Sequence, residues 1–361
     1  MSILVQLRQS LYLRQVVTLL GGSVLAQLIS LLAAPLLTRL YSPEAFGALA
    51  LFVAIVATLA PGVGGRYEVA VVVAAARERR NFFFIALWLT AALCLLFLLV
   101  LSALSASVSD WVNTGSLGNW LLLAPLALFV MGASAALRSW ANAIKDYRSL
   151  SYSAVVQATS VTVLALAFGV VGQLEDGLLF ANLTGSVLTC AYLTYVFRDL
   201  ARDGDWRWDL HKWALALRFK DYPLFSATAN ILNGVMTSLP VFFLAGHFPE
   251  AVVGYYALLV RVGVVPLSFI AEAVSRVNLK RIAELLEAGQ DTMPYLCRVT
   301  LSLLAVATFP SVLLMLFAPQ LFAWVFGATW NQAGELLVIL MPALAVQFTG
   351  PGYFRQLFFQ Q

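Results

Sequence analysis

The chain has 361 residues, of which 61% are hydrophobic and only 11% are charged, and its formal net charge is +4. Because soluble domains carry about 25% charged residues, this composition excludes a soluble two-domain enzyme of the same length. The mean hydropathy is +0.87. The apolar residues fall in blocks of about 20, the length that crosses about 30 Å of hydrocarbon, and they predict an all-α polytopic membrane protein.

The first apolar block follows basic residues near the N-terminus, as the apolar run of a signal peptide does. It continues to Leu37 without a small-residue cleavage site, so we interpret it as a retained first span. We expect about ten spans in all. Their predicted ranges are Val16–Leu37, Gly47–Val73, Phe82–Leu104, Trp120–Leu137, Ser151–Val171, Leu178–Val196, Leu224–Ala245, Ala251–Ala273, Tyr295–Phe317 and Leu336–Gly352.

The second predicted span is longer than a perpendicular crossing requires, and it contains Arg66 and Glu68. It can either tilt or bend, and Pro61 with the nearby Gly62 and Gly64 marks the place for a bend. An arginine at mid-membrane costs roughly 2.5–3.5 kcal/mol on insertion scales, so most such residues face a protein interior or a watery cavity. The other intramembrane arginine is Arg261, near the middle of the eighth span.

The basic residues predict the orientation of the chain. With the N-terminus in the cytoplasm, all lysines and arginines except Arg39, Arg66 and Arg261 fall in cytoplasmic segments, and Arg138 is counted among those after the fourth span. This asymmetry predicts a multi-pass membrane protein with its N-terminus in the cytoplasm. It also accounts for the basic charge without a nucleic-acid partner.

The stretch between the sixth and seventh spans predicts a linker. From Trp206 onward it is basic and amphipathic and carries Trp208 and Trp213, a composition typical of a helix at the membrane surface. The Asp203-Gly204-Asp205 sequence resembles the metal-binding pattern of sugar-nucleotide transferases. No soluble catalytic domain surrounds it, so we do not expect that role.

A short repeat predicts the architecture. Pro35, Pro43-Glu44-Ala45 and Gly47 near the first two spans are echoed by Pro240, Pro249-Glu250-Ala251 and Gly254 near the seventh and eighth. An even offset of six spans implies two parallel lobes related by an axis along the membrane normal. We therefore expect an N-lobe at 1–197, a linker at 198–223 and a C-lobe at 224–361. The C-lobe lacks its last two spans, so this copy is either short or truncated, and we expect truncation.

Few residues in this chain suit catalysis or metal binding. Cys94, Cys190 and Cys297 lack the spacing of a metal site, and the nucleotide-binding, metalloprotease and serine-hydrolase motifs are missing. We predict no cofactor and no metal, and a protein that is not an enzyme.

The intramembrane polar residues are the candidates for a binding site. On one helix, Arg66 and Glu68 would point in different directions, so we expect each to have a partner elsewhere or to face water. Cavity, ion-pair and snorkelling roles all stay open for Arg66, and a cavity role is favoured for Arg261. Glu272 lies near the cytoplasmic boundary, where an interfacial charge is the favoured interpretation.

Two asparagines could supply polar contacts in the seventh span. Asn230 and Asn233 lie three residues apart on one helix face, where their amides can bind sugar hydroxyls or join neighbouring helices. The sequence favours neither interpretation.

The chain resembles a known family at LTRLYSPEAFGALALF, RYEVAVVV, GYYALLVRVGVVPLSFIAEAVSRV and LFAWVFGATWNQAGELLVILMP. These stretches are similar to the flippases of bacterial polysaccharide biosynthesis, including O-antigen flippases, in the multidrug/oligosaccharidyl-lipid/polysaccharide (MOP) exporter superfamily. The resemblance implies two helical bundles in a V shape, as in MATE transporters, and a location in the bacterial cytoplasmic (inner) membrane. It also implies a polyprenyl-diphosphate-linked oligosaccharide as substrate, moved by alternating access for O-antigen, lipopolysaccharide, capsule or exopolysaccharide synthesis.

Site residues and partners follow from that interpretation. Arg66 and Arg261 would attract the diphosphate and Asn230 and Asn233 would contact glycan, while Glu68 and Glu272 are the candidates for ion coupling. A polysaccharide polymerase and a chain-length regulator are the implied protein partners, beside the lipid bilayer.

Two alternatives remain. A MATE-like drug or metabolite exporter would favour carboxylates in its cavity, against which the two arginines argue. A membrane glycan polymerase or ligase would need a larger outer loop or an acidic cluster.

Overall fold

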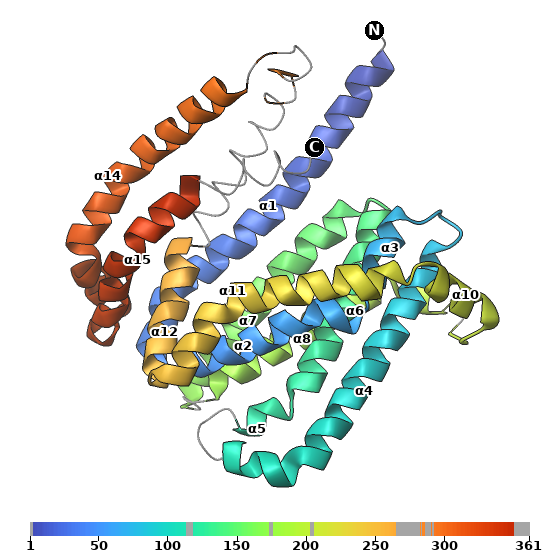
Figure 1. Ribbon diagram of the computed structural model, residues 1–361, viewed down its shortest axis with the longest axis horizontal. Helices are drawn as coiled ribbons and strands as arrows, with labels where there is room; N and C mark the ends of the chain where they lie inside the picture. Colours follow the sequence, from blue (N-terminus) through green and yellow to red (C-terminus); the bar gives the residue numbers. More distant parts are fainter. Residues whose placement is uncertain are drawn as a thin grey trace.

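The computed structural model describes residues 3–112, 118–172, 176–202, 206–264 and 292–349, together with residues 282, 284, 285 and 290. Within these ranges every regular element is a helix (Figure 1). The helices of the first half are α1 (Ile3–Leu40), α2 (Pro43–Val63), α3 (Tyr67–Val73), α4 (Arg79–Val112), α5 (Gly118–Leu121), α6 (Ala124–Ala143), α7 (Tyr147–Val171) and α8 (Gly177–Val196). Those that follow are α9 (Arg198–Arg202), α10 (Leu210–Arg218), η1 (Tyr222–Ala227), α11 (Thr228–His247), α12 (Glu250–Leu259), η2 (Val260–Val264), α14 (Met293–Phe326), η3 (Ala328–Trp330) and α15 (Asn331–Thr349).

Seven segments of the described residues are long and apolar enough to cross a membrane. They coincide with the first seven predicted spans and comprise Gly21–Leu40, Pro43–Val63, Arg79–Ala103, Ala124–Ala143, Tyr147–Val171, Gly177–Val196 and Tyr222–His247. The positions of the other three predicted spans are occupied by α12 with η2, by α14 and by α15, and parts of those spans lie outside the described residues.

The second predicted span is not one helix, which corrects the expected range Gly47–Val73. The Ser42 side chain caps α2 by accepting a hydrogen bond from the Ala45 backbone N–H at 3.3 Å, and Pro43 follows in the first turn. The helix ends at Val63, two residues after Pro61. A turn follows in which Arg66 takes the left-handed conformation, with φ 60° and ψ 12°. The break lies where the proline and glycines allowed a bend.

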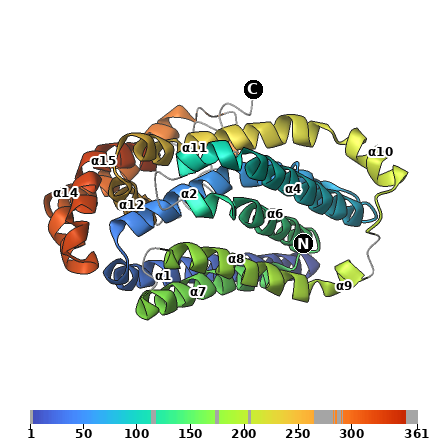
Figure 2. The same cartoon turned by 90° about the horizontal axis from the view of Figure 1, so that it is seen from below.

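The two halves pack closely on one another. Helix α2 packs against both α11 and α12, while α1 packs along α7 and α14 along α15. Figures 1 and 2 show α14 and α15 on one flank of the bundle and α10 on the other. Because α2 contacts two helices of the second half, it is the main element that joins the two halves.

Helix α10 lies in the predicted linker, with Asp209 as its N-cap and Trp213 exposed.

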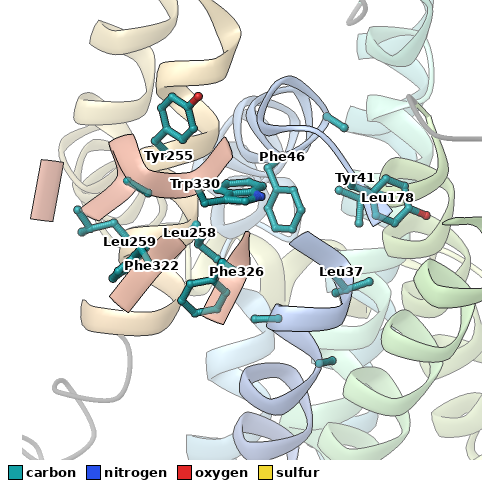
Figure 3. Close-up of a cluster of buried hydrophobic side chains, with 14 of the residues drawn as sticks. Leu37, Tyr41, Phe46, Leu178, Tyr255, Leu258, Leu259, Phe322, Phe326 and Trp330 are labelled. Atoms are coloured by element: carbon teal, nitrogen blue, oxygen red, sulfur yellow. The ribbon is translucent and has the colours of Figure 1, made fainter. Parts of the chain in front are cut away.

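A buried apolar cluster joins the halves where α2 and α12 begin, and we call this region the closed end (Figure 3). The Trp330 indole packs edge-on against Phe46 at 5.0 Å and against Tyr255 at 5.9 Å between ring centroids. Its Nε1 donates a hydrogen bond to the Thr38 carbonyl oxygen at 2.9 Å, so the buried indole is satisfied by backbone of the other half. Apolar burial and one hydrogen bond thus hold the halves together here.

Candidate functional site

A cavity of about 830 Å³ lies between the two halves and ends at the closed end. Residues of α1, α2, α6, α7 and α8 line it on one side, and residues of α11, α12 and η2 line it on the other. Its volume is within the range of sites that bind small molecules, which is about 300–1,000 Å³. The cavity therefore has the size of a ligand-binding site and lies between the two halves.

Helix α7 supplies one continuous wall of the cavity. Leu150, Ser153, Gln157, Val161 and Ala165 all line it. Their spacing of three or four residues places them on one helix face. At 1.5 Å per residue this face is about 22 Å long, compared with about 30 Å for the hydrocarbon core of a bilayer. The cavity therefore extends through much of the thickness of a membrane.

The lining is polar along several helices. Hydroxyl and amide side chains from α1, α7, α8, α11 and α12 line it, comprising Ser23, Gln27, Ser30, Ser153, Gln157, Thr162, Asn182, Thr237, Ser238 and Tyr256. The charged residues among the described lining residues are two arginines, Arg138 and Arg261, and no carboxylate is among them. Such a lining offers hydrogen bonds to hydroxyl groups and a positive field to an anion.

Arg261 enters the cavity from the second half. It lies in the π-helix η2, which directly continues α12, and π-helical turns are frequent at functional sites. Its Nη2 donates a hydrogen bond to the Ser30 carbonyl oxygen in α1 at 3.3 Å. Arg261 thus connects the two halves across the cavity, and its contact with a substrate stays a prediction.

Arg138 is a cavity residue that the sequence analysis missed. The fourth predicted span ended at Leu137 and Arg138 was assigned to a cytoplasmic segment, whereas α6 continues to Ala143. The guanidinium lines the cavity and its Nη2 donates a hydrogen bond to Gln157 Oε1 at 2.7 Å. The signal for this placement was the helix-favouring sequence around Leu137, which includes four alanines between Ser134 and Lys145.

Arg66 and Glu68 form an ion pair outside this cavity. Because Arg66 lies in the break rather than on a helix, its Nη1 reaches Glu68 Oε1 at 3.6 Å. The expectation that each of the two has a partner elsewhere or faces water is therefore wrong, since it assumed one continuous helix. Arg66 Nε and Glu68 Oε2 are buried without a hydrogen-bond partner. Neither residue is among the described residues that line the cavity, so their predicted roles in transport stay predictions.

The remaining predicted site residues are not found in the cavity lining of the described part of the chain. Asn230 donates its side-chain N–H to the Ser226 carbonyl oxygen at 2.8 Å, a bond to the preceding turn of the same helical segment. Asn233 is exposed on α11. Glu272 lies outside the described residues. Sugar binding by the two asparagines and ion coupling by Glu272 stay predictions.

The repeated residues meet at the closed end. Gly47 of α2 and Gly254 of α12 face one another, and a Cβ on either would overlap the backbone of the opposite segment, at the Glu250 carbonyl for Gly47 and the Pro43 carbonyl for Gly254. Small residues at helix crossings allow such close backbone approach in membrane proteins. The two copies of the repeat therefore form a contact with nearly symmetric partners, which the sequence alone did not reveal.

Comparisons with known sequences give one family match. A family model described as "Polysaccharide biosynthesis protein" matches residues 36–335. Among curated proteins, no sequence matches the chain.

Solved structures show the fold. A multidrug resistance MATE family transporter of the MOP superfamily, in an inward-facing conformation, is similar with a TM-score of 0.61 and 19% identity over 92% of this chain and 81% of that chain. An outward-facing transporter of the same description has a TM-score of 0.53 and 17% identity, and the match covers 93% of this chain and 83% of that chain. A MOP superfamily transporter from Pyrococcus furiosus has a TM-score of 0.50 and 17% identity, and the match covers 94% of this chain and 81% of that chain. The predicted all-helical, MATE-like fold is confirmed.

Proposed function

Because this chain belongs to the polysaccharide biosynthesis protein family, we propose that it is a flippase for a polyprenyl-diphosphate-linked oligosaccharide. The family and the fold are those of a multi-pass membrane transporter of the MOP superfamily. The lipid-linked substrate and its passage from the cytoplasmic to the periplasmic leaflet are the proposed part. In this view the chain is a transporter and carries out no covalent chemistry.

The charge of the cavity is the single observation that carries the proposal. Its described lining contains Arg138 and Arg261 but no carboxylate. A diphosphate leaving water needs charge-assisted hydrogen bonds, and the forked donors of arginine match phosphate oxygens. Hydroxyl and amide groups of the same wall suit sugar hydroxyls. The polyprenyl tail would stay in the lipid.

The charge of the lining also argues against the second candidate function, export of cationic drugs. Such a site would need carboxylates, because two half-buried guanidinium groups repel a cation. The Pyrococcus furiosus transporter is described as having a binding pocket of reversed polarity, which suggests a different function for that protein. In this chain the positive charge of the described lining favours an anionic substrate.

We assign the conformation as open to the cytoplasm. The buried cluster around Trp330 closes the end where α2 and α12 begin, which lies on the periplasmic side if the N-terminus is cytoplasmic. The TM-score of 0.61 to an inward-facing transporter, against 0.53 to an outward-facing one, supports this assignment. The chain would then lie in the inner membrane and deliver its cargo to a polymerase and a chain-length regulator, for O-antigen or another surface polysaccharide.

A reconstituted flipping assay tests the proposal. Purified protein in proteoliposomes should expose a polyprenyl-diphosphate oligosaccharide to a glycan-modifying enzyme outside the vesicles, and inorganic pyrophosphate should compete whereas a cationic drug should not. Arg261→Ala should abolish most of this flipping, and Arg148→Ala, which removes an exposed arginine at the start of α7, should retain it. Export of cationic drugs without glycan flipping would overturn the proposal in favour of the second candidate function.

A further inference from the structure

We propose that Arg138, oriented by Gln157, is the anion-binding residue that loads the substrate, while Arg261 acts in the later step that reopens the contact between the halves. This inference rests on the proposed function and divides its site into two parts. The observation behind it is the juxtaposition of Arg138 and Gln157 in the cavity wall, 2.7 Å apart through Nη2 and Oε1.

The two arginines differ in what they bind. Arg138 in α6 and Gln157 in α7 both belong to the first half, and α6 packs directly against α7. Arg261 belongs to the second half and donates to Ser30 in the first. When the halves move apart, the Arg138–Gln157 bond can persist, whereas the bond from Arg261 must break. Arg138 is thus a fixed position, and Arg261 a contact that changes with conformation.

They also lie at different depths. Gln157 is ten residues from the start of α7, about 15 Å from the end of the bundle where α6 and α7 meet. Ser30 is ten residues before the end of α1, about 15 Å from the closed end. Helix α7 itself is about 37 Å long. An anionic group that enters from the end opposite the closed end therefore meets Arg138 before Arg261.

The role of Gln157 follows from its neutral charge. Its oxygen accepts one N–H of the guanidinium and so fixes the direction of the side chain, but it does not neutralise the positive charge. A carboxylate at this position would orient the arginine equally well and would also occupy it as an ion pair. An amide here therefore leaves the guanidinium oriented and available for phosphate oxygens.

Gln157→Glu is the decisive variant, with Asn182→Asp as its matched control. Both add one carboxylate to the same cavity, but the structure places only Gln157 on Arg138. We expect Gln157→Glu to weaken the binding of inorganic pyrophosphate to the purified protein, measured by calorimetry, about 10- to 100-fold, the loss of one charge-assisted contact. Asn182→Asp should weaken it several-fold less, because a more distant carboxylate acts only through the screened field.

Further variants separate loading from the later step. Arg138→Ala should raise the apparent KM for flipping and Arg138→Lys should restore part of it, since lysine keeps the charge without the fork. Arg261→Ala should lower kcat more than it raises KM. Elution as a single peak and an unchanged melting temperature show that each variant is folded. If Gln157→Glu is not folded by these criteria, Gln157→Ala tests the orienting role of Gln157 instead. We expect it to lose pyrophosphate affinity and to keep a normal kcat.

The outcomes distinguish this inference from the proposed function. Normal flipping with an unchanged KM in Arg138→Ala would overturn the role of Arg138 and leave the flippase intact. Equal effects of Gln157→Glu and Asn182→Asp would overturn the orienting role of Gln157. Pyrophosphate binding that depends on Arg138 and Gln157, in a protein that flips no glycan lipid, would support this anion site while refuting the proposed substrate.

Discussion

Arg66 and Arg261 look alike in the sequence but occupy opposite environments in the structure. Each lies in an apolar stretch that follows a Pro-Glu-Ala turn. Arg261 reaches the cavity and donates to a backbone carbonyl of the other half. Arg66 lies at a helix break within the first half and pairs with Glu68. An intramembrane arginine therefore indicates a special environment, but only its partners show whether its charge is available to a ligand.

The partner of each arginine determines whether its positive charge is neutralised. Glu68 offsets the charge of Arg66, so this pair presents almost no net field to the cavity. Within the part of the chain that the structure describes, Arg261 donates to the Ser30 carbonyl and forms no ion pair, so its positive charge is not offset there. A guanidinium without a compensating carboxylate in a region of low dielectric attracts anions strongly.

The largest difference between the two arginines should appear in transport. Arg261→Ala is expected to lower the flipping rate about 30- to 100-fold, because the transition between conformations loses charge-assisted contacts to the substrate. Arg66→Ala should lower the amount of folded protein instead, with the rate per folded molecule within about threefold of wild type. Rates normalised to the folded fraction in proteoliposomes measure this. Equal rate losses in the two variants would make the arginines equivalent after all.

Substitutions at the closed end can change the environment of Arg261 while leaving Arg261 itself in place. Gly254 lies two turns before Arg261 on the same helical segment and contacts Pro43 of α2. In Gly254→Ala or Gly47→Ala the added methyl overlaps backbone, which costs about 1–3 kcal/mol in the closed arrangement and favours separation of the halves. Separation there should also draw Arg261 away from Ser30.

Thiol labelling measures this opening. In a background without the native cysteines, a cysteine replacing Leu37, which is buried and lines the cavity, should react about 10-fold faster with an impermeant reagent added from the periplasmic side. Gly246→Ala is the matched control, because its Cβ would meet nothing within 4 Å. Faster labelling in the control as well would rule out a specific role for the glycine crossing.

The Arg66–Glu68 pair should show its effect in stability. Glu68→Ala leaves a partly buried guanidinium without its carboxylate, and we expect a loss of about 1–3 kcal/mol in the free energy of unfolding. The double variant Arg66→Ala/Glu68→Ala should recover part of this loss, which a double-mutant cycle quantifies.

Arg77→Ala is the reference for a surface pair, since the Arg77 side chain is 86% exposed and pairs with Glu78 at 4.0 Å. That substitution should cost less than about 0.5 kcal/mol. Equal losses in Glu68→Ala and Arg77→Ala, measured by denaturant unfolding in detergent, would contradict a structural role for the Arg66–Glu68 pair.

Hydrophobic periodicity predicted the first seven spans well, because hydrophobic thickness constrains every span in the same way. The second predicted span starts at Gly47, whereas α2 starts at Pro43, because the Ser42 cap and Pro43 begin the helix before the apolar run. The cavity residues were harder to predict. Arg138 and Gln157 are brought together by the packing of α6 on α7, and the Arg66–Glu68 pair forms because a left-handed residue interrupts the helix. Such contacts depend on tertiary packing, which local sequence patterns do not encode.

The smallest effect is expected at Asn233, which the sequence offered as a glycan contact. Its side chain is exposed on α11 and is not part of the described cavity lining, and the Thr237 hydroxyl donates to its backbone carbonyl at 2.8 Å. Asn233→Ala should therefore leave the flipping rate within about twofold and the free energy of unfolding within about 0.5 kcal/mol of wild type. Asn182→Ala removes an amide that does line the cavity and should reduce the rate more. A larger loss in Asn233→Ala would mean that glycan passes along α11, outside the cavity that holds the two arginines.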